Sequence, residues 1–127
     1  MMKVQYPTIV LPQSGSGLET IQDTVVHYSI GFETFGLDEK QVSIWVFGTP
    51  MPVPNLLGWV EVSSWSSTAH FAMVGAPVVF VNFPLGASQY KALAWTMESR
   101  WARVVLQCPT WVLGGAWGVN AIFEART

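Results

Sequence analysis

Short apolar segments separated by glycine and proline turns run through the chain, and they constrain its fold more than any other feature. Turns such as FGLDEK at 35–40, GTPMPVPN at 48–55 and GAP at 75–77 separate the segments, and proline is excluded from the middle of a sheet because it lacks the ladder donor. In 26–32 every second residue is apolar, which is the period of a half-buried strand. About eight such segments predict an all-β fold, an antiparallel sandwich or jelly-roll-like barrel.

Residues 88–100 form the one segment whose pattern also fits a helix. Tyr90, Leu93 and Met97 recur at helical spacing, and Ser88 can cap the first turn. The same segment alternates tolerably as a strand. We therefore expect at most one short helix, near 88–100, with a strand as the alternative.

The first twenty residues predict an extended arm. Pro7 and Pro12 hold the backbone extended, and QSGSG at 13–17 is typical of a flexible hinge. The apolar residues of this arm favour docking on a neighbouring molecule. A chain of 127 residues has the size of one domain, so we expect an arm over 1–20 and a single β-sandwich domain over 21–127.

Charged residues are scarce, and the middle of the chain has almost none. Only 11% of the residues are charged, where about 25% is typical, and Glu61 is the only Asp, Glu, Lys or Arg between residues 41 and 90. Seven Trp and seven Phe supply too much buriable area for a disordered chain. The six Lys and Arg are dispersed and the net charge is −2, so no nucleic acid contact is expected.

The sequence contains no arrangement of residues that predicts a catalytic or metal site. Cys108 shares a strand face with Val104 and Leu106, which favours a buried structural thiol over a nucleophile paired with a histidine. His27 and His70 have no recognised ligand spacing with that cysteine. Neither a nucleophile elbow nor a phosphate-binding loop is present. We expect no enzymatic activity, no metal and no cofactor.

The first residues and the apolar runs of the chain indicate whether a signal peptide or a membrane span is to be expected. MMKVQYPTIVLPQSG lacks the long apolar run of a signal peptide, and no segment reaches the 18 or so apolar residues of a membrane span. A single cysteine excludes an internal disulfide. We expect synthesis in the cytoplasm without a signal peptide, and no membrane span.

Tryptophan is in surplus for a domain of this size. Trp45 lies on a strand that is apolar on both faces and is expected in the core, whereas Trp59 and Trp65 share a face with Glu61. Exposed rings could form a subunit interface, since interfaces are rich in aromatics and poor in Lys, Glu and Asp. They could instead stack on sugars, and a third interpretation buries all of them. The residues expected at a subunit interface are Tyr6, Ile9, Leu11, Trp59, Trp65, Trp111 and Trp117.

A short, cysteine-poor chain with the apolar stretch YPTIVLPQSGSG near its start, about eight strands and little charge resembles the small structural proteins of virions. Jelly-roll coat proteins, penton or vertex proteins and phage head-decoration proteins form this class. The resemblance covers the whole chain in general appearance. It implies a non-enzymatic capsid or decoration subunit that assembles with copies of itself or with other coat subunits into a virion. A carbohydrate-binding or host-attachment module is the alternative.

Overall fold

The computed structural model describes residues 4–48, 55–64, 70–81, 88–110 and 116–127. These residues form strands and no helix, so the prediction of an all-β fold is confirmed. In chain order the strands are Val4–Leu11 (β1), Glu19–Ile21 (β2), His27–Tyr28 (β3), Phe32–Glu33 (β4), Glu39–Gly48 (β5), Leu56–Ser63 (β6), Ala72–Phe80 (β7), Ser88–Trp95 (β8), Trp101–Gln107 (β9) and Trp117–Arg126 (β10).

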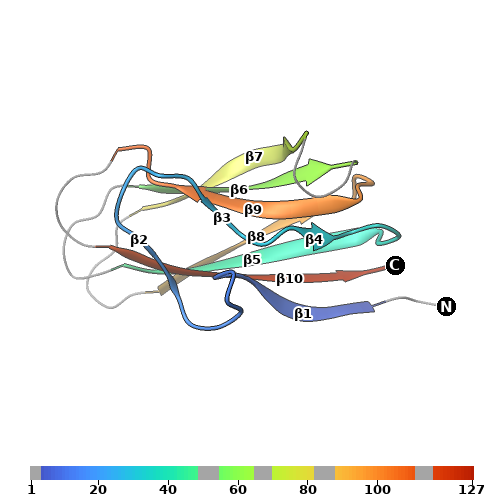
Figure 1. The fold of residues 1–127 in the computed structure, drawn as a ribbon, viewed down its shortest axis with the longest axis horizontal. Coiled ribbons are helices and arrows are strands. Elements are labelled where there is room, and N and C mark those ends of the chain that lie inside the picture. Colours follow the sequence, from blue (N-terminus) through green and yellow to red (C-terminus); the bar gives the residue numbers. More distant parts are fainter. Residues whose placement is uncertain (1–3, 49–54, 65–69, 82–87, 111–115) are drawn as a thin grey trace.

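The strands lie in two antiparallel sheets that pack face to face as a sandwich (Figure 1). The first sheet has the order β1-β10-β5-β8, with β2 also paired to β10. The second sheet has the order β3-β9-β6-β7, with β4 also paired to β9. The predicted antiparallel sandwich is therefore confirmed.

The pairing is nested along the chain. β6 and β7 pair with each other, β5 pairs with β8, β3 and β4 pair with β9, and β1 pairs with β10. Successive pairs fall in opposite sheets, so the chain behaves as one long two-stranded ribbon that folds over on itself. The resulting strand order is jelly-roll-like.

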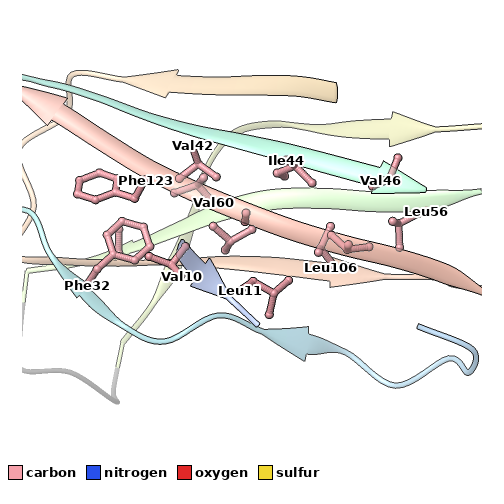
Figure 2. Packing of buried hydrophobic residues seen from close by; sticks show 14 of the residues in the cluster. Val10, Leu11, Phe32, Val42, Ile44, Val46, Leu56, Val60, Leu106 and Phe123 are labelled. Carbon is pink, nitrogen blue, oxygen red and sulfur yellow. The ribbon is translucent and has the colours of Figure 1, made fainter. Parts of the chain in front are cut away.

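The core lies between the two sheets and follows the period of two within each strand (Figure 2). In the first sheet the inward residues of β5 and β10 are fully or almost fully buried, and in the second sheet those of β6 and β9 face them. Gly58 is one of these inward positions, because a Cβ atom there would lie 2.9 Å from Leu106 and 3.1 Å from Ile44. The labelled core residues are Val10, Leu11, Phe32, Val42, Ile44, Val46, Leu56, Val60, Leu106 and Phe123.

The arm predicted for residues 1–20 is, from Val4 onwards, part of the sandwich. β1 pairs with β10 over its length, and β2 pairs with the beginning of the same strand. Val10 and Leu11 are completely buried in the core. The QSGSG segment turns the chain between these two strands, with a hydrogen bond from the Gly15 amide to the Pro12 carbonyl (2.9 Å). Val10 and Leu11, two of the apolar residues that favoured docking on a neighbour, are buried in the core of their own chain instead.

The segment predicted as a possible helix forms β8 instead. β8 pairs with β5 in eight consecutive positions, from Lys40–Trp95 to Phe47–Ser88. This long-range pairing separates the residues of the helical stripe, since Tyr90 points outward and Leu93 inward. Pairing with β5 requires residues that alternate between the two faces of the sheet. The segment meets this requirement by its alternation, and its helical spacing has no role in the structure.

The GAP run, predicted as a turn between two strands, lies inside the single strand β7. Val60 pairs with Val74 and Gly58 with Val78, so the β7 side has two extra residues between these pairs. Gly75 takes a left-handed backbone conformation there (φ 71°), which glycine adopts without steric cost. The turn signal therefore marks a bulge and leaves the strand continuous.

Deletion of residues 1–11 tests whether β1 is integral to the fold. Burial of two aliphatic side chains is worth about 3–6 kcal/mol, which is comparable with the roughly 5–15 kcal/mol stability of a whole domain. We expect the truncated chain to lose its cooperative urea transition and its near-ultraviolet circular dichroism. Deletion of residues 1–3 alone serves as the control and should retain both, and a cooperative transition in the longer deletion would contradict the prediction.

Candidate functional site

Large apolar side chains remain exposed on the outer faces of both sheets. On the second sheet they include Tyr28, Met73 and Val79, and on the first sheet Trp45 and Tyr90. The other exposed examples in the described part of the chain are Leu18, Val25, Ile30, Phe35, Phe47, Val81 and Met97. Two groupings among these residues have defined geometry, one on each sheet.

The first grouping, which we call the arginine cluster, consists of Tyr28, Trp59, Glu61, Phe71 and Arg103. β6 supplies the tryptophan and the glutamate at alternate positions, so both point outward. β9 supplies the arginine directly opposite the glutamate, and β3 supplies the tyrosine one row away. The phenylalanine immediately precedes β7. Four separate segments of the chain therefore meet at the centre of this face.

The carboxylate of Glu61 organises the arginine cluster. Its Oε1 atom accepts a hydrogen bond from Arg103 Nε (2.8 Å) and lies 2.7 Å from Arg103 Nη2. Its Oε2 atom accepts a hydrogen bond from Trp59 Nε1 (3.1 Å). The guanidinium carbon lies 4.3 Å from the centre of the Tyr28 ring and 4.2 Å from that of Phe71. The cation is thus in contact with two aromatic rings and an anion together.

These contacts fix the positions of the side chains in the arginine cluster. Both oxygens of Glu61 are engaged by neighbouring donors, and its side chain is only 18% exposed, as against 27% for Arg103. The pair is neutral as a unit, and around it the apolar residues Tyr28 and Met73 are exposed. Arg, Tyr, Trp and Met are the residue types enriched where proteins bind one another. The arginine cluster therefore has the composition of an interface anchor.

The second grouping lies on the outer face of the first sheet. Trp45 of β5 and Tyr90 of β8 are opposite each other, and their rings stack with centroids 4.7 Å apart at an interplanar angle of 24°. Asn120 of β10 is the opposite neighbour of Trp45, and its Oδ1 atom is buried without a hydrogen-bond partner. Trp45, expected in the core, is 37% exposed, because the inward positions of β5 are taken by its valines and isoleucine.

A hollow of about 750 Å³ lies at the end of the first sheet where β5 begins and β8 and β10 end. Its rim holds the ion pair between Arg126 and Glu39. Lys40 also lines it, but the ammonium donates hydrogen bonds to the carbonyls of Leu37 and Met97 (2.9 Å each), and burial lowers its pKa. This cation is therefore used to hold the chain together. The full lining is Pro7, Glu39, Lys40, Gln41, Ala94, Trp95, Thr96, Glu124, Ala125 and Arg126.

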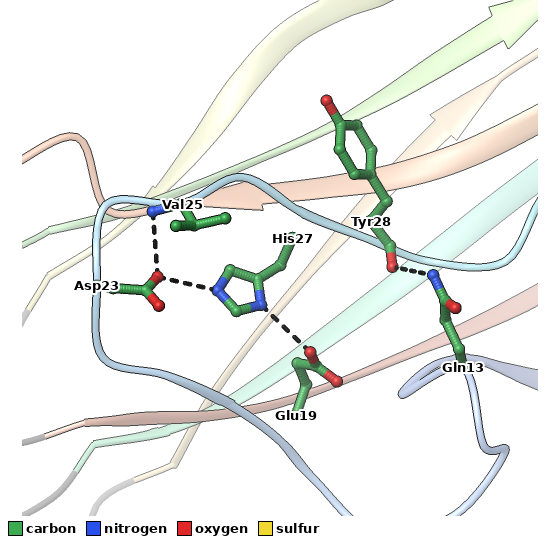
Figure 3. Close-up of polar contacts among 6 residues, drawn as sticks. All are labelled: Gln13, Glu19, Asp23, Val25, His27 and Tyr28. Carbon is green, nitrogen blue, oxygen red and sulfur yellow. Dashed lines mark hydrogen bonds and ion pairs between the residues drawn. The ribbon is translucent and has the colours of Figure 1, made fainter.

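His27 lies between two carboxylates (Figure 3). Its Nδ1 atom is 3.2 Å from Glu19 Oε1 and its Nε2 atom is 3.2 Å from Asp23 Oδ1. Asp23 also accepts a hydrogen bond from the Val25 amide (3.1 Å). Because each ring nitrogen faces a carboxylate, neither is directed at a nucleophile. The arrangement ties β2 to β3 across the two sheets.

Cys108 is completely buried in the core, as the sequence predicted. Burial, with a smaller effect from the negative charge of Asp23, raises the pKa of its thiol to about 11. A thiol with this pKa remains protonated at neutral pH, and the protonated form is not the nucleophile. Within the described ranges, no three His, Cys, Asp or Glu side chains come together as a metal site, and no helix has the length and hydropathy needed to cross a membrane.

The residues predicted for a subunit interface differ in how deeply the structure buries them. Leu11 and Trp117 are buried in the core of their own chain, because both fall at inward positions of the first sheet, and they leave the candidate interface. Ile9 is half-buried on β1, and Trp59 is half-buried in the arginine cluster. The remaining three are Tyr6, which belongs to β1 but whose side chain is outside the described part, and Trp65 and Trp111, which lie outside the described residues altogether.

Sequence reasoning missed most of the residues around Trp59. Arg103 is one of the six dispersed Lys and Arg residues and Tyr28 is one of the alternating apolar residues of 26–32, and neither was predicted at an interface. A usable signal existed, since Glu61 is the one charge in a fifty-residue stretch and points from a strand that is otherwise apolar. A partly buried carboxylate requires a cation or several donors. Arg103, itself between apolar residues of a strand, was the matching candidate.

No protein family model matches the chain, and no curated protein matches its sequence significantly.

A double-mutant cycle on Glu61 and Arg103 tests the arginine cluster. Glu61→Gln and Arg103→Gln should each lower the free energy of unfolding by about 1–3 kcal/mol, because each leaves a half-buried charge without its partner. The double variant should be less destabilised than the sum of the two, with a coupling of about 1 kcal/mol or more. Glu33→Gln, at an exposed glutamate of β4, is the control and should change stability by less than about 0.5 kcal/mol. A coupling near zero in urea titrations would contradict the geometry.

Proposed function

We propose that the chain is a non-enzymatic structural subunit of an oligomeric assembly, and that the assembly is a virion in which it serves as a coat or decoration protein. The observation that supports this proposal best is the outer face of the second sheet. There Tyr28, Met73 and Val79 are exposed around an arginine that two rings and a carboxylate hold in place. An ordered surface loses little side-chain entropy when a partner covers it.

The scarcity of charge supports the same proposal. Among residues 62–97 the only Asp, Glu, Lys or Arg is Lys91, although most residues of β7 and of β8 are exposed to solvent in the single chain. Exposed apolar area of this kind promotes association, and a partner subunit would cover it.

The virion part of the proposal is supported by analogy of fold together with the resemblance described above. Double-sheet jelly rolls recur in viral capsid proteins and also in lectins, and a fold alone does not specify a function. On this proposal the mature location of the protein is the virion, and its partners are copies of itself or other coat subunits.

Absolute mass in solution tests the proposed assembly. We expect light scattering after size exclusion, over a hundredfold range of concentration, to give a fixed multiple of 14.0 kDa. Met73→Lys should reduce that mass or raise the dissociation constant at least tenfold while leaving the urea midpoint within error, since Met73 is 48% exposed. Thr20→Lys, at an exposed position of β2, is the matched control. A 14.0 kDa species at every concentration would overturn the proposal.

A carbohydrate-binding module is a second candidate function, and the outer face of the first sheet favours it. Trp45 and Tyr90 are exposed there and form a stacked aromatic pair. Aromatic rings can pack on the apolar faces of sugars.

Tryptophan fluorescence tests this candidate. A panel of glucose-, galactose- and mannose-containing oligosaccharides should change the emission of the native protein, and Trp45→Ala should abolish the change without unfolding the chain. Trp59→Phe, on the other sheet, should preserve it. If no member of the panel changes the emission and calorimetry detects no heat, this second function is eliminated.

A further inference from the structure

The four edges of the two sheets differ in how well they are protected against pairing with another strand. β1 contains Pro7 and two irregularities in its register with β10. β7 contains Pro77 and the bulge at Gly75. β3 and β4 are only two residues long each. Proline, bulges, short length and charged side chains, lysine above all, are devices by which natural proteins keep an edge from recruiting a further strand.

β8 has only the last of these devices, in Lys91. It pairs with β5 in eight consecutive positions without irregularity and contains no proline. In the described part of the chain it lies at the end of the first sheet, with no strand on its other side. It is long and regular, it contains no charged residue other than Lys91, and most of its residues are exposed. An edge of this kind is a template for another strand.

Two side chains of β8 further distinguish it from the neighbouring edge of the second sheet. Lys91 Nζ donates a hydrogen bond to the Val79 carbonyl (2.8 Å), and Gln89 Nε2 donates to the Val81 carbonyl (2.6 Å). These bonds occupy backbone acceptors of β7 and of the residue that follows it. They also draw the lysine, which could otherwise protect the β8 edge, across to the other sheet. Of the four edges, β8 is therefore the one that presents a regular row of backbone groups to a further strand.

We propose that β8 pairs antiparallel with β8 of a second copy of this chain, which joins the two first sheets into one continuous sheet across a two-fold axis. This inference rests on the proposed function and names one contact of the assembly. A strand and its symmetry mate are always complementary in length and alternation, because a two-fold interface places the same surface on both sides. Main-chain hydrogen bonds supply the attraction, as in other cases of strand addition.

The residues of β8 select the register. A two-fold axis perpendicular to the sheet places one residue opposite its own copy, and only axes at Lys91 or Ala92 let nearly the whole strand pair. An axis at Lys91 would place two like charges directly opposite each other, which is destabilising. An axis at Ala92 places Tyr90 opposite Ala94 of the partner subunit on the outer face, so that a large side chain meets a small one. The geometry therefore points to Ala92 at the axis.

Cysteine cross-linking tests this register. Directly opposite residues of antiparallel strands have Cβ atoms about 4.5–5.5 Å apart, close to the range that a disulfide spans. Oxidation of Ala92→Cys with diamide should give a covalent dimer on a non-reducing gel. Ala94→Cys is the matched control and should remain mostly monomeric, because its symmetry mate would be four residues away along the strand. The native Cys108 is buried and should not interfere.

Charge substitutions at the axis provide a second, reversible test. Ala92→Lys should weaken association at least tenfold by light scattering, and Ala92→Glu should do the same, because each places like charges opposite each other. A mixture of the two variants should recover association. Ala92 is exposed on the outer face, so neither change should move the urea midpoint by much.

The outcomes separate this inference from the proposal on which it rests. If the protein is oligomeric but Ala92→Cys does not cross-link and Ala92→Lys leaves the mass unchanged, the subunits associate through another surface and the β8 contact is wrong. If the native protein is monomeric throughout the concentration range, both fail. Equal cross-linking by Ala94→Cys would overturn the register.

Discussion

The pairing of β10 is the constraint on which the rest of the structure depends. This strand, the last in the chain, pairs with β1, β2 and β5 and contributes Trp117, Val119, Ala121 and Phe123 to the core. The first sheet is complete only when β1 and β2 meet β10, so most of its contacts join residues far apart in sequence. Such a fold loses a large loop-closure entropy before its core is complete, and β1, with Val10 and Leu11 buried, is part of that core.

The scarcity of charge has different consequences in different parts of the sandwich. In the second sheet the lone carboxylate of Glu61 meets Arg103 and two aromatic rings, and the charge becomes part of an ordered apolar surface. In the first sheet Lys91, the only charged residue of β8, donates a hydrogen bond to a carbonyl of the other sheet. Both effects follow from one property of the sequence, namely that it contains very few charged side chains.

The fold class followed from local patterns, whereas the exposure of individual residues did not. Alternation and turn residues were enough to predict an antiparallel sandwich, and Cys108 was correctly expected to be buried because its strand neighbours are apolar. Trp45 was expected in the core, but a strand that is apolar on both faces does not reveal which face is inward. That choice depends on the register with β8 and β10. Leu11 and Trp117 were misjudged for the converse reason, since their inward positions became visible only once β1 and β10 were paired.

The sequence by itself determined that the chain is all-β, that most of its strands are separated by glycine and proline turns, and that it has little charge to present to water. Local backbone preferences and composition are sufficient for these conclusions because they do not depend on which segments meet. The tertiary structure alone decided that residues 4–11 complete the first sheet, that 88–95 form an edge strand and no helix, and that Glu61 faces Arg103. These outcomes depend on pairing between strands that are distant in the sequence. The free energy of such a pairing depends on the residues of both strands, so neither segment predicts it alone.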